Sequence, residues 1–404
     1  MIQGHSGSPS PDVIVVGGGI TGCSAAAFLA AAGARVLLVE RDGLASGASG
    51  ANAGAIWHPF DPVLVGLYRE SLGLYRDLAA DSPMFRMGDA PVGLLAVSKD
   101  DAVVRGHAAA VGAAWPDLDA RVLDPADVAA VEPVVAPGLW ACRLDLGYPI
   151  APASGTYGFA TLAETRGVVV RAGRGARLVR DGDRVTGVEL AAGEVFTAGA
   201  VIVTAGPWTP ALIDPSGSWR PIRPLWGVVV EVEMDPAPRH IVDEVGAEGS
   251  EATDDELEGR VTRDPDFEAA ASRTEREMPS VEHCFTGIVP TPGVTSVGGT
   301  NLDVEPEPSA WIEPLLVRAI GLVPGVVEAP IRGVRCCPRP LSADGRPLVG
   351  AVPGSRGLYV AAGHGPWGIS TGPATARMVS ELATGGAPEI PAELDPARFG
   401  VPGA

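Results

Sequence analysis

Cysteine is scarce in this sequence, and the few cysteines follow no pattern that would build a disulfide framework or a metal site. The chain of 404 residues holds five, none of them in a CxxC pair: Cys23, Cys142, Cys284, Cys336 and Cys337. Disulfide-rich folds and structural zinc sites both require regularly spaced cysteines. We therefore expect no metal, and we predict reduced thiols in a cytoplasmic protein.

Basic residues are also few. Lys99 is the only lysine, and 30 basic residues stand against 49 acidic ones, which gives a formal net charge of -19. A charge of this sign repels phosphate backbones and anionic lipid. The sequence thus disfavours nucleic acid and membrane surfaces as partners and favours a small-molecule substrate. The oligomeric state stays open.

No hydrophobic run is long enough to suggest a membrane span. The apolar stretch 25–39 is interrupted by Gly33 and Arg35, whereas a spanning helix needs about 20 predominantly apolar residues. Residues 1–11 are polar and lack the basic start and apolar core of a signal peptide. Both observations predict a chain without a membrane anchor.

The first lobe is predicted from a strand pattern that occurs four times. Short β-branched runs at 12–16 and 35–39 flank a glycine cluster and an alanine-rich helix over about 21–32. The same strand pattern returns at 200–203 and 358–362, each time followed by a glycine turn. We expect these late strands to join the first sheet.

A second lobe is predicted from the segments that lie between these strands. Runs at 225–232 and 295–299, set between proline and glycine turns, are typical of strands. The predicted fold class is α/β, with a Rossmann-like nucleotide-binding lobe interleaved with an antiparallel-sheet α+β substrate lobe. The predicted boundaries are 1–90, 150–215 and 335–404 for the first lobe, and 91–149 and 216–334 for the second.

An acidic insertion is predicted at 243–282. The segment carries 14 Asp or Glu against four Arg, with few large apolar residues. This composition favours a solvated, partly disordered insertion. An active-site lid is the alternative.

A glycine-rich turn after the first strand predicts dinucleotide binding. Gly17, Gly19 and Gly22 form GxGxxG between strand and helix, and Glu40 ends the next strand, 23 residues after Gly17. The glycines permit a tight turn, close approach of a pyrophosphate and close helix packing, while the carboxylate can bind ribose hydroxyls. The motif does not choose between NAD and FAD, although Glu40 disfavours a 2′-phosphate.

A second GxGxxG, at Gly363, Gly365 and Gly368, has a different interpretation. Only some 20 residues follow the helix predicted over about 370–384, and no strand ending in an acid follows it. A nicotinamide site would need that βαβ unit. We instead expect this helix to direct its N-terminus at the pyrimidine side of a flavin, where negative charge develops on reduction. The electrons then come from the substrate itself.

The chain resembles the superfamily of D-amino acid oxidase, glycine oxidase and sarcosine oxidase over nearly its whole length. The motifs that carry the resemblance are the N-terminal GxGxxG with Glu40, residues 47–54 (GASGANAG), 204–208 (TAGPW), 298–300 (GGT), and the closing run from Arg339 through 344–347 (DGRP) to 363–365 (GHG). The resemblance implies FAD as the cofactor of the first lobe. Together these motifs are specific for the superfamily and not for one member.

The resemblance also implies which residues contact the cofactor, because the loop after the ribose-binding acid passes under the flavin in this family. The predicted cofactor contacts are Gly17, Gly19, Ile20, Gly22, Glu40, Arg41, Ser49, Asn52, Ala53, Gly54, Arg177, Ala205, Gly206, Trp208, Cys337, Gly363, His364, Gly365, Gly368 and Ile369. Cys337 falls where sarcosine oxidases carry the cysteine that is bonded to the flavin. We expect non-covalent FAD, with a covalent link through Cys337 as the alternative.

The resemblance also implies a set of residues near the substrate. Ile56, Trp57 and His58 should emerge there, and His58 could equally be a residue outside the site. Arg339 lies five residues before Asp344, where the resemblance implies an arginine that binds the substrate carboxylate through its planar fork. A structural salt bridge is the alternative role for Arg339. The predicted catalytic residues are Arg339, His58 and His364, and the predicted substrate contacts are Ile56, Trp57, Arg335 and Trp367.

These residues predict an FAD-dependent enzyme that oxidises the C–N bond of a small amino acid or secondary amine to an imine by hydride transfer to flavin N5. Oxygen is the expected acceptor, although the lysine that sarcosine oxidases hold near the flavin is missing around 295–296. One alternative is a dehydrogenase of a 2-hydroxy acid or amino acid that passes electrons to a quinone or carrier protein. Another is a flavin-holding regulatory protein without turnover.

Overall fold

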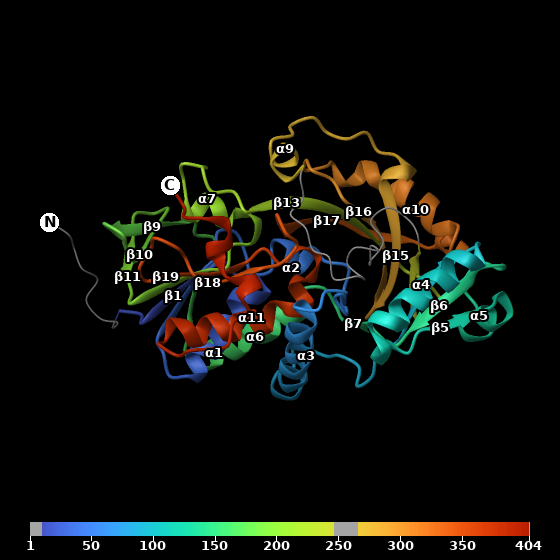
Figure 1. The fold of residues 1–404 in the computed structure, drawn as a ribbon, viewed down its shortest axis with the longest axis horizontal. Helices are drawn as coiled ribbons and strands as arrows, with labels where there is room; N and C mark the ends of the chain where they lie inside the picture. Colours follow the sequence, from blue (N-terminus) through green and yellow to red (C-terminus); the bar gives the residue numbers. More distant parts are fainter. Residues whose placement is uncertain (1–9, 246–265, 404) are drawn as a thin grey trace.

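The computed structural model describes residues 10–245 and 266–403. Residues 1–9, the first part of the segment examined for a signal peptide, and residues 246–265 of the predicted acidic insertion lie outside the described residues. Two large sheets form the two ends of an elongated molecule (Figure 1). Within the described ranges, no helix combines the length and the hydrophobicity needed to cross a membrane.

A six-stranded sheet forms the first lobe. Its strands follow the order β18-β19-β12-β1-β2-β8, and every neighbouring pair is parallel except β18 with β19. The two strands predicted to return to this sheet do so, since β12 pairs with β1 and β19 pairs with β12. The strands are β1 (Val13–Val16), β2 (Val36–Val39), β8 (Val169–Arg171), β12 (Ala200–Val203), β18 (Leu348–Ala351) and β19 (Leu358–Ala362).

The uninterrupted apolar runs of these strands are explained by burial on both faces. Val13 and Val15 pack into the core beneath the helices, whereas Ile14 and Val16 pack against a three-stranded antiparallel sheet on the other face. That smaller sheet consists of β9 (Ala176–Asp181), β10 (Arg184–Leu190) and β11 (Val195–Thr197). The first lobe therefore has three layers.

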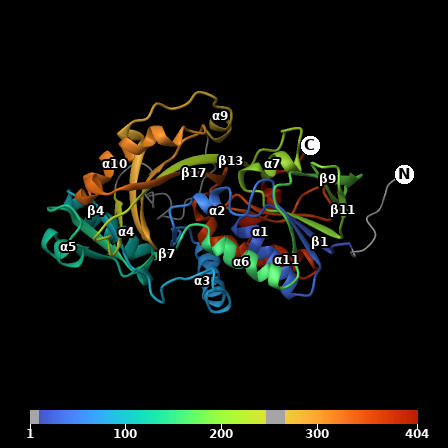
Figure 2. The ribbon, with the colours of Figure 1, turned by 180° about the vertical axis from the view of Figure 1, so that it is seen from behind.

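The helices α6, α1 and α11 lie side by side across one face of this lobe, with α3 against α11 (Figure 2). Close packing is possible because α1 presents alanines such as Ala25, Ala26 and Ala27, all fully buried, to its neighbours. The helix predicted over 21–32 is α1, and the one predicted over 370–384 is α11. The bounds are α1 (Ile20–Ala31), α3 (Leu64–Asp81), α6 (Ser154–Thr165) and α11 (Gly368–Ala383).

The second lobe is built on an eight-stranded sheet of order β17-β13-β16-β15-β14-β4-β6-β5. All neighbouring pairs are antiparallel except β14 with β4. Both predicted strands of this lobe are present, as β13 and β16. The strands are β4 (Leu94–Ser98), β5 (Arg121–Leu123), β6 (Trp140–Leu144), β13 (Ile222–Val232), β14 (Ile241–Glu244), β15 (Cys284–Thr291), β16 (Val294–Thr300) and β17 (Ile331–Ser342).

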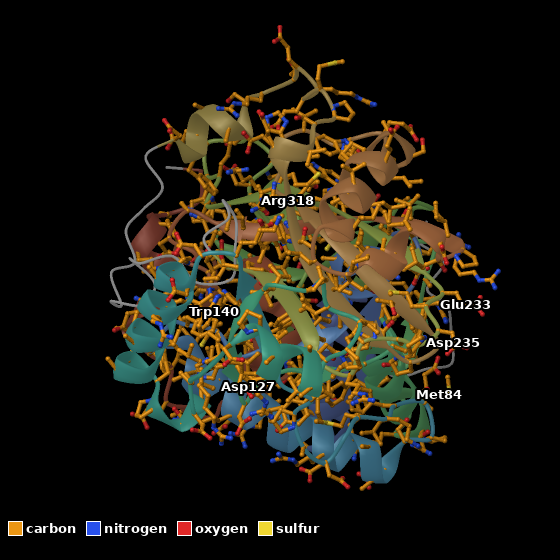
Figure 3. The ribbon with its side chains drawn as sticks, turned by 90° about the vertical axis from the view of Figure 1, so that its right-hand side faces the viewer. Met84, Asp127, Trp140, Glu233, Asp235 and Arg318 are labelled. Carbon is orange, nitrogen blue, oxygen red and sulfur yellow. The ribbon has the colours of Figure 1, made fainter. Side chains whose placement is uncertain are left out.

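One face of this sheet packs on α10, and the other faces the first lobe. Side chains alternate accordingly: Val228, Val230 and Val297 share a core with Leu315 of α10. Figure 3 views this lobe from its end, with Arg318 of α10 and Trp140 of β6 labelled. The other strands and α-helices of the described residues are a two-stranded sheet of β3 (Ala55–Ile56) and β7 (Tyr148–Pro149) and the helices α2 (Ala48–Ala51), α4 (Asp101–Ala114), α5 (Pro125–Val131), α7 (Thr209–Ile213), α9 (Phe267–Ala271) and α10 (Ile312–Ile320).

The fold class is the predicted one, α/β with two interleaved lobes. Strand β17 runs continuously across the predicted boundary at 335 and belongs wholly to the second sheet.

The predicted acidic insertion needs a correction at its start. Asp243 and Glu244 belong to β14, and Asp243 is buried, so this part is not solvated. The high number of acidic residues suggested no strand here, because the apolar residues of β14, Ile241 and Val242, lie just before the predicted start of the insertion. The part that follows 265 holds α9 and a short 3-10 helix, Val281–His283.

Candidate active site

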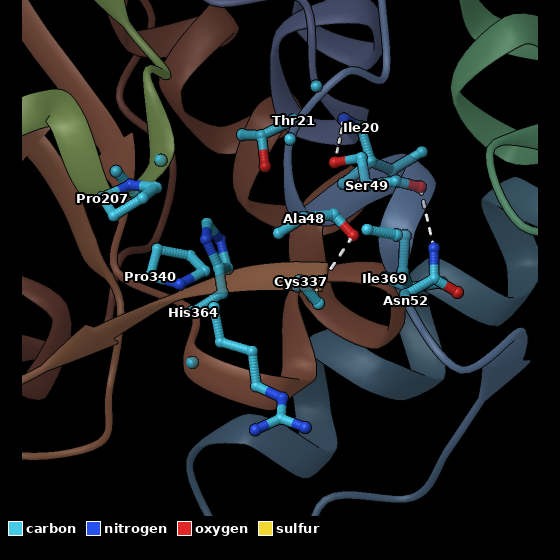
Figure 4. A pocket seen from close by; sticks show the side chains of 18 of the residues that line it. Ile20, Thr21, Ala48, Ser49, Asn52, Pro207, Cys337, Pro340, His364 and Ile369 are labelled. Atoms are coloured by element: carbon cyan, nitrogen blue, oxygen red, sulfur yellow. Dashed lines mark hydrogen bonds between the residues drawn. The ribbon is translucent and has the colours of Figure 1, made fainter. Parts of the chain in front are cut away.

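A cavity of about 710 Å³ lies between the two sheets. Segments that are distant in the sequence line it: the β1–α1 turn, the α2 loop, the turn after β12, the cavity-facing side of β13, β15 and β17, and the start of α11 (Figure 4). Figure 4 shows Ile20 and Ser49 on one side of this space and Pro340 and His364 on another. Both ends of the chain therefore contribute to one site.

The β1–α1 turn packs so closely that two of its positions require glycine. Gly17 has φ of +119°, and a Cβ there would lie 2.4 Å from the carbonyl oxygen of Thr204. A Cβ on Gly22 would lie 1.8 Å from the carbonyl oxygen of Gly17, so only glycine lets α1 pack this closely on the turn. Helix α1 begins at Ile20 without a side-chain cap, and the Ile20 amide donates to Ser49 Oγ at 2.9 Å. Amides at a helix N-terminus favour a bound phosphate.

Glu40 lies at the end of β2, beside this turn. Its Oε2 accepts a hydrogen bond from the Gly18 amide at 2.6 Å, and its Oε1 accepts one from the Asp42 amide at 2.9 Å. The carboxylate is thereby held in the wall of the cavity. Arg41 stacks over the ring of Trp208 at 4.4 Å in the same wall.

Arg339 lies on the side of β17 that faces the cavity. Its Nη1 donates to the carbonyl oxygen of Thr300 at 2.8 Å and to Asn301 Oδ1 at 2.6 Å. The guanidinium crosses Gly227 on the neighbouring strand, where a Cβ would lie 2.2 Å from a guanidinium nitrogen. It also lies 5.8 Å from the centre of the Phe285 ring. These contacts hold the guanidinium as one wall of the cavity.

Cys337 lies two residues earlier on the same face of β17. Its thiol is buried, 3.8 Å from the carbonyl oxygen of Ala48, and burial raises its pKa above the ordinary value. A protonated thiol is a poor nucleophile.

The two predicted catalytic histidines lie in different surroundings. His364 lines the cavity in the turn before α11, and its Nε2 lies 2.8 Å from Thr375 Oγ1. His58 is enclosed by the rings of Phe60, Tyr68 and Trp115, and neither of its ring nitrogens has a partner among the described residues. Burial lowers the pKa of both histidines to about 4. Both are therefore neutral at pH 7.

Arg335 is held by other protein groups. It forms an ion pair with Glu231, and its Nη2 donates to the carbonyl oxygen of Asn52 and to Ser296 Oγ, both at 3.0 Å. Arg177 is paired with Glu189 at 2.5 Å on the outside of the first lobe.

The structure brings most of the predicted site residues together. Those that line the cavity are Gly17, Gly19, Ile20, Glu40, Arg41, Ser49, Asn52, Ala53, Trp57, Ala205, Gly206, Trp208, Cys337, Arg339, His364, Gly365, Trp367, Gly368 and Ile369. The other seven lie behind or away from its wall: Gly22, Gly54, Ile56, His58, Arg177, Arg335 and Gly363.

Several cavity residues were not predicted. Phe285 and Asp243 line the cavity from the second sheet, Asn301 lines it from the position after β16, and Arg174 lines it from the loop after β8. Phe285 could have been suggested by strand alternation, because the residues on either side of it in β15 are buried. The burial of Asp243 depends on the pairing of β14 with β4 and β15. Asn301 and Arg174 carry no comparable signal.

The cavity fits a dinucleotide with a flavin ring, since backbone amides and missing Cβ atoms form one end and the N-terminus of α11 the other. Comparisons agree. Residues 12–382 match the model of the DAO family, FAD dependent oxidoreductase. The chain therefore belongs to this family, whose cofactor is FAD.

Individual relatives differ in how much of their length is matched. A D-amino acid dehydrogenase of Cereibacter sphaeroides is 32% identical over 61% of this chain, and the match spans 50% of that protein. The chain thus spans about half the length of the first curated relatives. Glycine oxidase of Pseudomonas aeruginosa is 27% identical over 96% of this chain and 98% of its own length. Among solved structures, glycine oxidase from Bacillus cereus is similar in fold, with a TM-score of 0.74, 23% identity and coverage of 93% and 95% of the two chains.

Proposed function

We propose that this protein oxidises the C–N bond of a small amino acid or secondary amine to an imine. The observation that carries the proposal is Arg339, whose guanidinium forms a wall of the cavity on the sheet that faces the nucleotide turn. A guanidinium is suited to a carboxylate because its planar fork donates two parallel hydrogen bonds. When bound, FAD supplies the hydride acceptor, N5 of its ring.

The residues of this chain would orient the substrate and stabilise negative charge. Arg339 would fix the substrate carboxylate and so place the carbon that bears nitrogen. The turn from His364 to Gly368 offers amides and the positive end of α11, which favour negative charge at this end of the cavity. We propose that His58 has a structural role through its packing against aromatic rings. We propose that Arg335 has a structural role through its ion pair with Glu231.

The state of the cofactor follows from Cys337. Because burial raises the pKa of its thiol, we propose that FAD is bound without a covalent link. Acid precipitation of the holoenzyme should then leave all of the flavin in the supernatant, and flavin that stays with the protein would contradict this. We also propose a cytoplasmic location, on the ground that the five cysteines are free.

The test of the carboxylate site uses two variants of the holoenzyme. Arg339→Ala should raise the apparent dissociation constant of carboxylate substrates by about 30-fold or more, since loss of one partner of a buried charge pair costs about 2–5 kcal/mol. Arg339→Lys keeps the charge without the fork and should recover only part of the affinity. FAD content serves as the control and should not change. An unchanged Michaelis constant in Arg339→Ala would refute the carboxylate role.

The electron acceptor needs its own experiment. We propose oxygen, and steady oxygen uptake with release of peroxide would support it. Relatives named D-amino acid dehydrogenase favour a second candidate, in which a quinone or carrier protein takes the electrons. Turnover with an artificial carrier but not with oxygen would support that candidate.

A further inference from the structure

A buried carboxyl group lies in the cavity and has no role in the function proposed above. Asp243, on β14, is only 4% exposed and is one of the cavity-lining residues. Its neighbour Val242 packs into the core beside α10, and Ile241 packs on the opposite side with the first lobe. By strand alternation, Asp243 shares the face of Ile241 and points away from α10.

The sheet beside Asp243 leaves room above it. Asp243 is opposite Gly287 of β15, which is in turn opposite Gly298 of β16. All three line the cavity. Two successive strands therefore carry no side chain at this level, where a molecule lying on the sheet can reach the carboxyl group. The ring of Phe285 covers the next residue of β16, Gly299, on the side of Arg339.

Among the described residues, no side chain balances the charge of Asp243. Its Oδ1 accepts a hydrogen bond from the Glu244 amide at 2.9 Å, and within the described ranges no cationic side chain pairs with it. Glu244 itself is paired with Arg318 at 2.8 Å. Burial raises the pKa of Asp243 to about 7. A buried carboxylate without a counter-ion is costly and is commonly found where a ligand supplies the missing charge.

The opposite charge lies on the same face of the same sheet. The guanidinium of Arg339 crosses β13 and reaches the carbonyl oxygen of Thr300 on β16, two strands away from β14. Along the strands, Thr300 lies two residues beyond Gly298, which is level with Asp243. Two strand spacings and two residues along the strand together correspond to roughly 12 Å. Two ion-pair contacts of about 2.8 Å each would leave a few ångströms for a bound molecule, enough for a small zwitterion.

We propose that Asp243 binds the cationic nitrogen of the substrate. The cavity then recognises a zwitterion at two points, with Arg339 binding the carboxylate and Asp243 binding the ammonium group. This inference rests on the proposed function, because it assumes that Arg339 holds the carboxylate. It adds a specificity determinant that distinguishes amino acids from carboxylates without an amine.

Other charged groups bear on the pH dependence of this contact. On the same face of the sheet, Arg335 and Glu231 neutralise each other as an ion pair, and Arg339 is positive throughout. His364, in the turn before α11, is neutral at pH 7. On the neighbouring strands the residues of this face are uncharged, namely Leu94 and Ala96 on β4 and Phe285, Gly287 and Val289 on β15. Asp243 is therefore the group whose ionisation should govern cation binding near neutral pH.

The test compares ligands that differ only in an ammonium or a methyl group. Glycine and propionate form a short pair, and 5-aminopentanoate and hexanoate form a longer one. Binding to the holoenzyme is measured anaerobically from the change in flavin absorbance, at pH 8 and pH 5.5. Where an amine reduces the flavin, the concentration dependence of reduction is used. The variants are Asp243→Asn, Asp243→Glu and Arg339→Ala.

For at least one pair, the wild-type protein should prefer the ammonium member by about tenfold or more at pH 8. This preference should fall at pH 5.5, disappear in Asp243→Asn and persist in part in Asp243→Glu, with methyl-ligand binding and FAD content unchanged. A preference that survives in Asp243→Asn, or its absence from the wild type in both pairs, would overturn the inference. If Asp243→Asn does not fold, the inference is tested by the wild-type protein alone, whose ammonium preference must fall between pH 8 and pH 5.5. Arg339→Ala should weaken both members of a pair. If it does not, while Asp243→Asn still loses the ammonium preference, the carboxylate site at Arg339 is wrong and only the cation site at Asp243 stands.

Discussion

The packing of Gly22 on the nucleotide turn gives a sharp prediction for the variant Gly22→Ala. The added Cβ would lie 1.8 Å from the carbonyl oxygen of Gly17 and 2.6 Å from Thr204 Oγ1, whereas ordinary contacts begin at 3.4 Å. The shortfall at Gly17 is 3.4 - 1.8 = 1.6 Å. The carbonyl group of Gly17 is backbone and cannot move by this distance locally, so α1 must move away from β1. Overpacking of this kind costs about 1–3 kcal/mol.

The same movement should weaken FAD binding, because it carries the amides at the start of α1 away from the pyrophosphate. We expect Gly22→Ala to lose most of its FAD on gel filtration and to melt at a lower temperature. The matched control is Gly66→Ala on α3, where an added Cβ has nothing within 4 Å. This control should keep its FAD. Its free energy of unfolding should rise by up to about 1 kcal/mol, since alanine is the better helix former. If Gly22→Ala retains the FAD content and melting temperature of the wild type, the role assigned to this glycine is wrong.

Three further predictions concern single side chains. In the protein without ligand, Asp243→Asn should raise the melting temperature at pH 8 and have little effect near pH 4. The pKa of Asp243 is raised from 3.8 to about 7 in the fold, so its ionised form destabilises the protein as pH rises through that range; an equal effect at both pH values would contradict this. His58→Leu should leave kcat/KM within about twofold and remove part of the loss of stability between pH 6.5 and 4, because a buried neutral histidine resists protonation; a tenfold loss of kcat/KM would instead indicate a catalytic role. Glu40→Gln should weaken FAD binding by about tenfold or more, as measured by flavin fluorescence on titration, since hydrogen bonds to charged groups contribute about 1.5–3 kcal/mol; unchanged affinity would remove Glu40 from the ribose site.

The first lobe was predictable from the sequence because its signals are local. The strand, glycine turn, helix and second strand around Gly17 follow one another without interruption, and each element is nearly or wholly buried. The late strands at 200–203 and 358–362 repeat the same apolar pattern. Their place in one parallel sheet follows from that repetition.

The second lobe was less predictable because it depends on pairing between distant segments. Asp243 was counted in an acidic, solvated segment, although β14 places it between β4 and β15 inside the sheet. Only that pairing makes a short run with two apolar residues into a buried strand. His58 shows the same limit. It lies behind the cavity wall because its ring packs against those of Phe60 and Trp115, and the second of these residues is distant in the sequence.

The central claim is that one FAD, bound between the two sheets, takes its electrons directly from an amine substrate. The most direct measurement is anaerobic mixing of the holoenzyme with glycine, sarcosine, proline and D-amino acids, while the absorbance of the flavin is recorded. At least one of these compounds should bleach the flavin within a single turnover, and NADH and NADPH should not. Bleaching by a nicotinamide alone, or a purified protein that stays colourless after reconstitution with FAD, would contradict the account.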